Sequence, residues 1–451
     1  MELLDPLFGS DAVNEIFTDR SRLQRMLDFE AALARAEARV GVIPKSAPGP
    51  IEAQCRSELF DLSALGRATV KTGNHAIPMV KELTALVGKH SEEATRYVHW
   101  GATSQDVVDT GLILQLRDAL SAIRADLDHL CDSLTILAGQ HRSTPVAART
   151  LMQQAVPTVF GLKVAGWLDA LARHRVRLQE LQPRVMVVQF GGAAGTLAML
   201  GDRGLDVAAA LAGELQLTLP AVPWHGHRDR VVEVATTLAL LTGTLGKMAR
   251  DISLQMQTEV GEVFEPSERG RGGSSTMPHK RNPITCAVVL AAADRVPGLT
   301  GIMLAAMPQE HERSLGGWHA EWQTLPEIVR LSAGALHHMV EAVAGLEIDP
   351  GRMQQNLELT HGLIFAEAVT AVLARKIGKM KAHQILETAS RKAFGDKKHL
   401  RDVLTADPEV LPHLDKSEIE QLFEPLKYTG VAGQFIDRAI AASKGGSAKR
   451  D

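Results

Sequence analysis

Two long stretches of the chain repeat apolar residues every three or four positions. They cover residues 116–137 and 231–252, and the second helical pattern continues to about residue 263. This heptad spacing is typical of helices that pack lengthwise at a shallow angle. Helices of about 30 residues are roughly 45 Å long, which is more than the core of one compact domain needs. We therefore expect them to line up with helices of other copies in an oligomer.

Further helical patterns predict an all-α fold. Helices are expected over residues 23–41, closed by Gly41 as the C-terminal cap, and over residues 157–181, 283–307 and 326–346. The long helices would form a central antiparallel bundle. The expected domains are an N-terminal helical domain (1–110), this central bundle (111–350), and a smaller C-terminal helical domain (351–451) whose final SKGGSAKRD is disordered.

The composition of the 451 residues narrows the class of protein. Apolar residues make up 45% and aromatic residues only 4%, which suits closely packed helices rich in Ala, Leu and Val. A net charge of −4 gives no footprint for nucleic acid or an anionic membrane. The pattern also shows no signal peptide and no uninterrupted apolar run long enough to span a bilayer. Cys55, Cys131 and Cys286 are far apart and lack metal-ligand spacing, so we expect a cytoplasmic, reducing environment.

The stretch GGSSTMPHKRNP, at positions 272–283, interrupts sequence that otherwise favours helices. Asn282 is a favoured N-cap and Pro283 suits the first helical position, so a helix is expected to begin there with its positive end toward the loop. Together with Lys280 and Arg281, this predicts an anion site beside the hydroxyl of Ser274. The preceding EPSERGRGG has the polar, glycine-containing character of a mobile lid. The alternative is a basic surface loop.

Other polar stretches stand near the ends of predicted helices. Taken singly, each is more often a helix cap or a surface loop than a site, but several such loops at bundle ends can converge on one cleft. The candidate residues are His75, His99, Thr103, Ser104, Asp106, Gln153, Thr158 and Arg313, the last as a carboxylate clamp.

Two stretches imitate known motifs without fulfilling them. Residues 185–201, VMVVQFGGAAGTLAMLG, look like a strand, a glycine-rich turn and a helix, but the glycines do not fit the dinucleotide fingerprint. His225 and His227 have a spacing that can ligate a metal, yet no acidic or cysteine partner follows at a recognisable interval. We expect neither a nicotinamide cofactor nor a metal.

The chain resembles the fumarase/aspartase superfamily, whose signature is similar to G-S-S-x-M-P-x-K-x-N-P. Residues 273–283 match every fixed position, and the similarity extends over nearly the whole chain. The resemblance implies a three-domain fold, a cofactor-free homotetramer, and active sites assembled from loops of three subunits. It also implies that Ser274 is the catalytic acid/base and that Lys280 and the helix start stabilise its alkoxide.

The resemblance assigns the remaining candidates as well. His75 and His99 match two active-site histidines of adenylosuccinate lyases, a branch of this superfamily. The substrate carboxylates would be held by Thr103, Ser104, Gln153, Thr158, Lys280, Asn282 and, as a weaker candidate, Arg313.

Two departures from the family pattern concern one acid/base pair. The histidine that lyases usually carry is Leu151 here, and its partner glutamate is Ala287. A lyase expels water or an amine, which needs a proton, whereas a lactone opens by expelling a carboxylate that is stable as an anion. The leaving-group pKa values, about 10 and about 4, differ by roughly 8 kcal/mol in proton affinity. The pair is therefore dispensable in a cycloisomerase.

The implied activity is the lactonisation of 3-carboxy-cis,cis-muconate, a small tricarboxylate, in the protocatechuate branch of the β-ketoadipate pathway. Three alternatives stay open: a β-elimination enzyme similar to adenylosuccinate lyase, an inactive structural relative, and an NAD-binding protein. The intact signature argues against the inactive relative.

Overall fold

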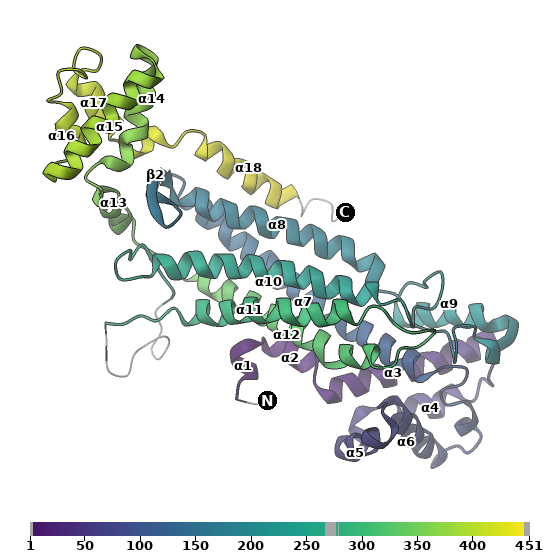
Figure 1. The fold of residues 1–451 in the computed structure, drawn as a ribbon. Helices are drawn as coiled ribbons and strands as arrows, with labels where there is room; N and C mark the ends of the chain where they lie inside the picture. The colour runs from purple at the N-terminus through teal and green to yellow at the C-terminus, as the bar shows by residue number, and fades with distance from the viewer. Residues whose placement is uncertain (1–2, 267–276, 278, 446–451) are drawn as a thin grey trace. The chain divides into compact units, whose positions relative to one another are not determined.

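The computed structural model describes residues 3–266, 277 and 279–445, and its regular structure is predominantly helical (Figure 1). The predicted all-α class is therefore confirmed. The chain divides into two compact units: Met1–Asp126, His174–Leu245 and Val288–His338 form the first, and Leu127–Arg173, Gly246–Ala287 and Met339–Asp451 the second. The expected domain boundaries at residues 110 and 350 stay a prediction.

Five long helices contribute residues to both units, and hydrogen bonds join them. Within the first unit, the Thr242 hydroxyl donates to that of Ser332 at 2.8 Å, and His174 Nε2 lies 2.8 Å from the Thr244 hydroxyl. The helices are α7 (Ser104–Gln140), α8 (Phe160–Val185), α10 (Asp229–Gln255), α11 (Ile284–Ala305) and α12 (Gly317–Ala344).

Both heptad seams lie on long helices, the first on α7 and the second on α10, and every seam residue is buried within the single chain. This corrects the reasoning from the seams to an oligomer, because a single copy already covers them. Two predicted bounds were also wrong. Helix α10 ends at Gln255 rather than near residue 263, where a short strand runs, and α12 begins nine residues before Pro326, which it accommodates in its interior.

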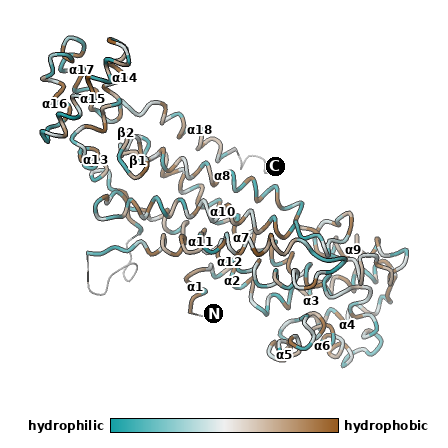
Figure 2. The backbone as a smooth tube through the Cα atoms, in the orientation of Figure 1, coloured by the Kyte–Doolittle hydropathy of each residue, from teal (hydrophilic) through white to brown (hydrophobic). Residues whose placement is uncertain are grey.

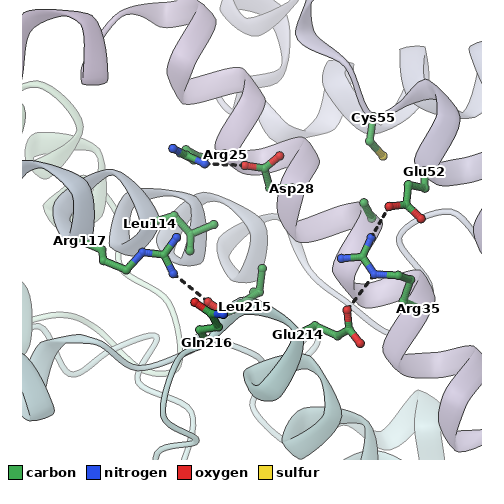
Figure 3. A pocket seen from close by; sticks show the side chains of 11 residues that line it. Arg25, Asp28, Arg35, Glu52, Cys55, Leu114, Arg117, Glu214, Leu215 and Gln216 are labelled. Carbon is green, nitrogen blue, oxygen red and sulfur yellow. Dashed lines mark hydrogen bonds and ion pairs between the residues drawn. The ribbon is translucent and has the colours of Figure 1, made fainter. Parts of the chain in front are cut away.

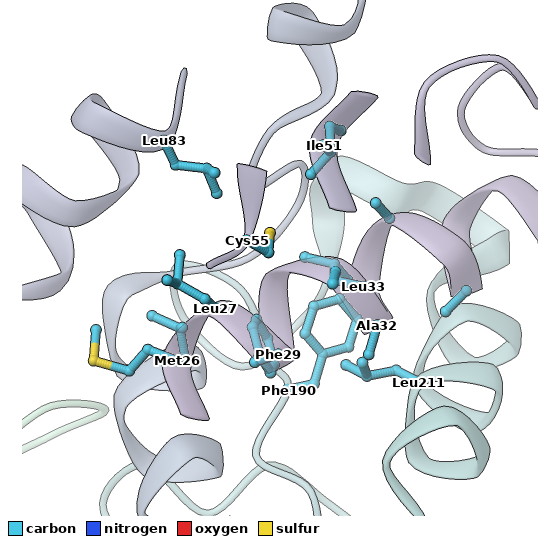
Figure 4. Close-up of a cluster of buried hydrophobic side chains, with 14 of the residues drawn as sticks. Met26, Leu27, Phe29, Ala32, Leu33, Ile51, Cys55, Leu83, Phe190 and Leu211 are labelled. Atoms are coloured by element: carbon cyan, nitrogen blue, oxygen red, sulfur yellow. The ribbon is translucent and has the colours of Figure 1, made fainter. Parts of the chain in front are cut away.

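The first unit is built around α3 (Asp19–Val40), which ends at Gly41 in the left-handed conformation, as predicted. Its apolar face packs with Phe190 and Leu211 into a continuous core (Figure 4). The other elements of this unit are α1 (Asp5–Phe8), α2 (Asp11–Ile16), α4 (Pro48–Gln54), η1 (Ser57–Leu59), α5 (Leu62–Thr72), α6 (Ala76–Gly88), η2 (Ala94–Tyr97), η3 (Ala198–Arg203) and α9 (Gly204–Leu215).

Two glutamates of α3, Glu30 and Glu37, are buried on this apolar side of the helix. Within the described residues, neither carboxyl oxygen of Glu37 has a hydrogen-bond partner. Burial, helped by the charge of Glu30, raises the pKa of Glu37 to about 9. Glu37 is therefore a neutral acid at neutral pH.

The second unit contains its own apolar core and the strands. Helix α18 (Ala432–Gly445) includes the first residues of the predicted disordered tail, so that prediction is wrong for Ser443–Gly445. The remainder of the tail lies outside the described residues. The elements are β1 (Pro145–Thr150), β2 (Gln153–Val159), β3 (Val263–Phe264), β4 (Glu347–Ile348), α13 (Pro350–Glu358), η4 (Leu363–Phe365), α14 (Ala366–Ile377), α15 (Lys379–Asp396), α16 (Leu400–Leu404), α17 (Lys416–Leu422) and η5 (Pro425–Tyr428).

Two helices, α10 and α11, are long and apolar enough by length and composition to cross a membrane, and a third span arises only if the bent pair Pro350–Glu358 and Leu363–Ile377 counts as one. These helices do not contradict the expectation that no uninterrupted apolar run is long enough to span a bilayer. Charged residues interrupt the apolar stretches, as Asp294 and Arg295 do in α11, but the mean hydropathy of each helix stays apolar. Hydropathy alternates along the helices (Figure 2). Of the apolar window, 61% is buried in α10 and only 33% in α11.

Candidate active site

The carboxylate of Asp106 organises the polar end of the first unit. It is fully buried in the first turn of α7 and accepts five hydrogen bonds. The donors are the backbone N–H groups of Thr103, Gly191 and Gly192 at 2.9–3.0 Å, the Gln189 amide at 3.1 Å and His225 Nε2 at 2.7 Å. Charge-assisted bonds of this kind fix the segments that carry the donors.

The paired glycines of the 185–201 stretch serve this contact. A Cβ on Gly192 would lie 2.9 Å from the Gly101 carbonyl oxygen, and its φ of 67° is in the left-handed region, so only glycine fits this approach. The expected strand is reduced to an isolated bridge between Val187 and Thr218. His225, one of the two histidines with metal-ligand spacing, binds the Asp106 carboxylate instead.

Thr103 and Arg313 lie together although 210 positions separate them. Arg313 Nη2 donates to the Thr103 hydroxyl at 2.9 Å and to the Ala193 carbonyl at 3.2 Å. Both acceptors are neutral. By contrast, the buried Arg228 of this unit binds the carboxylates of Asp109 and Glu321. The charge of Arg313 is thus not neutralised by a carboxylate in any contact of the described chain. Ser104 begins α7 beside Thr103 and is half-buried.

His99 is held by a glutamate that the sequence analysis missed. Its Nδ1 lies 2.6 Å from Glu30 Oε1, and the Glu30 side chain is 1% exposed while that of His99 is 16% exposed. Burial opposes a charge on the ring, but the charge and hydrogen bond of Glu30, with the charge of Asp106, outweigh it and raise the pKa of His99. His99 is therefore favoured as a cation.

His75 has the opposite environment. Its ring stacks edge-on against Trp322 with 4.9 Å between centroids, and its Nε2 is buried without a partner. Burial first, then the positive charges of Arg22 and His319, lowers the pKa of His75 to about 4. The ring is neutral at neutral pH and lines a pocket of about 280 Å³ with Arg22 and Trp322. The surroundings thus separate two histidines that the sequence could not tell apart.

In the second unit, Gln153 and Thr158 lie on a β-hairpin, although the sequence analysis placed Gln153 ahead of a helix and Thr158 inside it. The predicted helix start at residue 157 was wrong, because β2 runs to Val159 and α8 begins at Phe160. Strands β1 and β2 pair in antiparallel fashion, and Leu151 and Met152 form the two-residue turn, both with positive φ. Gln153 is exposed and Thr158 half-buried. Leu151 is 98% exposed and Met152 70% exposed. Leucine and methionine are unusual at a turn that normally takes Asn or Gly, so the tip carries local strain.

The start of α11 does not present a free anion site. The Glu265 carboxylate, buried in the second unit, accepts the backbone N–H groups of Thr285 at 3.0 Å and Cys286 at 2.8 Å. The anion at this helix end is thus the carboxylate of Glu265, a residue of the chain itself. This corrects two predictions, because Glu265 is an anchor and the helix begins at Ile284 rather than at Pro283. The part of the expected lid from residue 267 to 273 lies outside the described residues.

Arg281 strengthens the same anchor instead of binding a ligand. It donates to the Glu265 carbonyl and to both carboxyl oxygens of Glu347, all at 2.8 Å, and its guanidinium lies 4.6 Å from the centre of the Phe264 ring. Lys280 is exposed and Asn282 half-buried. Ser274 lies outside the described residues.

A larger pocket of the first unit, of about 440 Å³, contains none of the predicted site residues (Figure 3). Arg25 and Arg35 line it, and both bind carboxylates. Arg117 donates to the Leu215 carbonyl at 2.9 Å and lies 3.6 Å from the Asp118 carboxylate. The arginine charges are therefore compensated, and this pocket does not compete with the predicted site residues for an anion.

A sequence signal for Glu30 and Glu265 does exist. Glu30 continues the apolar i, i+3, i+4 stripe of α3 defined by Leu23, Met26 and Leu27, so it is an acid at a core position, which calls for a partner. Glu265 gives a weaker signal, since only its proximity to the signature distinguishes it.

Comparisons with known proteins cover nearly the whole chain and indicate a single family. A lyase family model matches residues 8–298, and a model of the adenylosuccinate lyase C-terminus matches residues 362–439. The 3-carboxy-cis,cis-muconate cycloisomerase of Pseudomonas aeruginosa is 55% identical over 440 residues, covering 98% of this chain and 96% of that protein. Nitrosuccinate lyase of Streptomyces davaonensis is 44% identical, with 97% and 94% covered. The crystal structure of 3-carboxy-cis,cis-muconate lactonizing enzyme from Pseudomonas putida is 53% identical, with a TM-score of 0.96 and coverage of 99% and 100%.

Replacing Glu265 tests the anchor at α11. Glu265→Ala leaves two buried N–H groups without an acceptor, so we expect the free energy of unfolding to fall by about 2–4 kcal/mol. Urea unfolding followed by circular dichroism measures it. Glu259→Ala, an exposed carboxylate of the same unit, is the matched control and should change stability by less than about 0.5 kcal/mol. Equal stability of the two variants would show that Glu265 is not an anchor.

Proposed function

Because the chain belongs to the lyase family of the fumarase/aspartase superfamily, we propose that it is a cycloisomerase that lactonises 3-carboxy-cis,cis-muconate to 4-carboxymuconolactone. The observation that carries this proposal is the 55% identity, over 98% of the chain, to a relative that bears this activity in its name. The reaction belongs to the protocatechuate branch of the β-ketoadipate pathway.

The proposed mechanism is an intramolecular addition. One carboxylate of the substrate attacks the conjugated alkene and forms the C–O bond, the adjoining carboxylate takes up charge as an enediolate, and a proton is then delivered to carbon. Ser274 is the proposed donor, and Lys280 stabilises the enediolate. The backbone N–H groups of Thr285 and Cys286 do not take part, since Glu265 occupies them.

The substrate carboxylates need cations and hydrogen-bond donors. Arg313 becomes a stronger candidate than the sequence suggested, because its guanidinium bonds only to neutral oxygens. His99 supplies a second positive charge, and neutral His75 is suited to accept or donate a hydrogen bond. The other proposed substrate-binding residues are Thr103, Ser104, Gln153, Thr158 and Asn282.

The absence of the lyase acid/base pair supports a leaving group that needs no proton. In the single chain, however, Leu151 stands exposed at the hairpin tip and Ala287 is exposed on α11. One copy of the chain therefore does not bury either residue. The argument from the missing pair therefore rests on the chemistry of the leaving group and not on the packing of these two residues.

A homotetramer fits the surface that one copy leaves uncovered. Two thirds of the apolar window of α11 is not buried, and the strained hairpin tip exposes Leu151 and Met152. Apolar surface of this kind marks a contact with another chain. We propose that copies of this chain cover it. We further propose, from the resemblance to the family and from the composition, a three-domain organisation with a shared bundle and a cytoplasmic location without membrane or nucleic-acid contact.

Turnover of 3-carboxy-cis,cis-muconate tests the function directly. Purified protein should consume the diene without added cofactor, as followed by its ultraviolet absorbance, and should release neither amine nor fumarate from adenylosuccinate in a parallel assay. Efficient cleavage of adenylosuccinate would favour the elimination enzyme, and inactivity toward both substrates would favour the inactive relative.

Ser274→Ala should reduce kcat by at least about 100-fold, the usual contribution of general acid catalysis, because it removes the proton donor and keeps the anion-binding groups. Affinity for a tricarboxylate inhibitor should change by less than about threefold. Ser275→Ala, the neighbouring hydroxyl, is the control. Turnover of the Ser274 variant within a few-fold of the unmodified enzyme would remove Ser274 from the mechanism.

Sedimentation velocity tests the assembly. The chain has a mass of 48.7 kDa, so a tetramer should sediment as a particle of about four times that mass. Ile302→Glu, on the exposed apolar side of α11, should weaken assembly because it places a charge in the contact. A stable, fully active monomer would contradict both the tetramer and the shared site.

A further inference from the structure

We propose that Glu30 is a positioning residue for the reaction: it holds the His99 imidazole through Nδ1, so that Nε2 is presented to a substrate carboxylate. The inference rests on the proposed function, which it deepens by assigning one carboxylate contact and the residue that prepares it.

The first support is the hydrogen bond itself. A carboxylate only accepts hydrogen bonds, so Nδ1 of His99, 2.6 Å from Glu30 Oε1, must carry the proton. Nδ1 is therefore protonated in both the neutral ring and the cation, and Nε2 is the nitrogen left for a ligand. The ring is 16% exposed, whereas Glu30 is 1% exposed. Glu30 therefore lies inside the protein, and His99 lies nearer to the surface.

The backbone gives a second, independent support. His99 has a φ of 59°, a left-handed conformation that is unfavourable for a residue with a side chain. Such strain persists only where surrounding contacts hold it, and it clusters at functional sites. The bond to Glu30 is one of those contacts, and the 101–106 turn pinned by Asp106 follows directly along the chain.

The charges around the ring all favour a cation. The groups that act on it are Glu30 from α3 and Asp106 from α7, both negative, and together they overcome the cost of burial. Asp106 is itself bonded to His225 and to backbone N–H groups. The second oxygen of Glu30 is buried without a partner, so no other cation shares this carboxylate in the described chain. An imidazolium placed here has Nε2–H free to donate to a carboxylate.

A variant that removes only the charge of Glu30 tests the proposal. Glu30→Gln keeps an oxygen that accepts the Nδ1 proton but no longer stabilises the cation. The affinity for propane-1,2,3-tricarboxylate is measured by titration calorimetry between pH 5.5 and 8.5. We expect its decline with rising pH to begin at least about one unit lower in the variant. Binding should be about tenfold weaker near pH 8 and should converge with the unmodified enzyme to within about threefold at pH 5.5.

The sign follows from the direction of the shift. His99 is cationic below its pKa, so a raised pKa extends tight binding to higher pH, and loss of the Glu30 charge withdraws that extension. In turnover the effect should appear mainly in KM, because the contact already exists in the bound ground state. A purely structural defect would instead weaken binding equally at all pH values.

Glu37→Gln is the matched control, since Glu37 lies two turns along the same helix, is equally buried and is neutral at neutral pH. Its pH profile should coincide with that of the unmodified enzyme. His99→Asn is the second variant, because asparagine tolerates positive φ and its amide can still donate to Glu30. It should bind the tricarboxylate weakly, and its affinity should show no decline with rising pH that is due to His99. This result tests the proposal even if Glu30→Gln fails to fold.

Two results would overturn the proposal: parallel pH profiles for Glu30→Gln and the unmodified enzyme, or a His99→Asn variant that keeps the original pH-dependent decline. These outcomes are separable from failure of the proposed function. If the unmodified protein binds the tricarboxylate with the expected pH dependence but does not turn over 3-carboxy-cis,cis-muconate, the role of Glu30 stands and the reaction assigned to the site is wrong.

Discussion

The Asp106 carboxylate is the constraint on which the polar end of the first unit depends. Five donors from three separate stretches of chain meet on its two oxygens. Because the group is fully buried, each lost bond would leave an unpaired donor or charge in a dry environment, and such losses cost more than the bonds contribute in water. The positions of Thr103 and of the glycine pair follow from this one group, and its charge reaches His99 as well.

The second unit uses the same device at two places. Glu265 holds the first N–H groups of α11, and the buried Glu262 receives both ends of the Arg149 guanidinium at 2.7 and 2.9 Å. Internal carboxylates thus already bind hydrogen-bond donors that could otherwise bind a polyanionic substrate. The groups left without a compensating carboxylate, among which Arg313 is the clearest, are then the ones able to discriminate for a ligand. Under the proposed function, substrate selectivity would depend on which cations have no internal carboxylate partner.

The sequence predicted what depends on local patterns. The heptad seams placed α7 and α10, Gly41 ended α3, and the signature marked the family. It did not predict contacts between distant segments. The Leu151–Met152 turn was missed because its residues are not typical of turns, and the occupant of the α11 start was missed because Glu265 is an ordinary acid in a polar stretch until the chain folds back. Glu30 was missed for another reason: an acid on an apolar stripe was overlooked among alanines.

Glu37 has a consequence for the thermodynamics of folding. Its carboxyl is neutral in the folded chain up to about pH 9, whereas in an unfolded chain a glutamate ionises near pH 4.3. Between these values, folding takes up a proton at this position. Each unit of rising pH in that window then removes about 1.4 kcal/mol of stability through Glu37. Glu37 causes no such loss of stability below the pKa of the unfolded chain, and the loss is largest in alkaline solution. One side chain in the core therefore makes the folding equilibrium depend on pH.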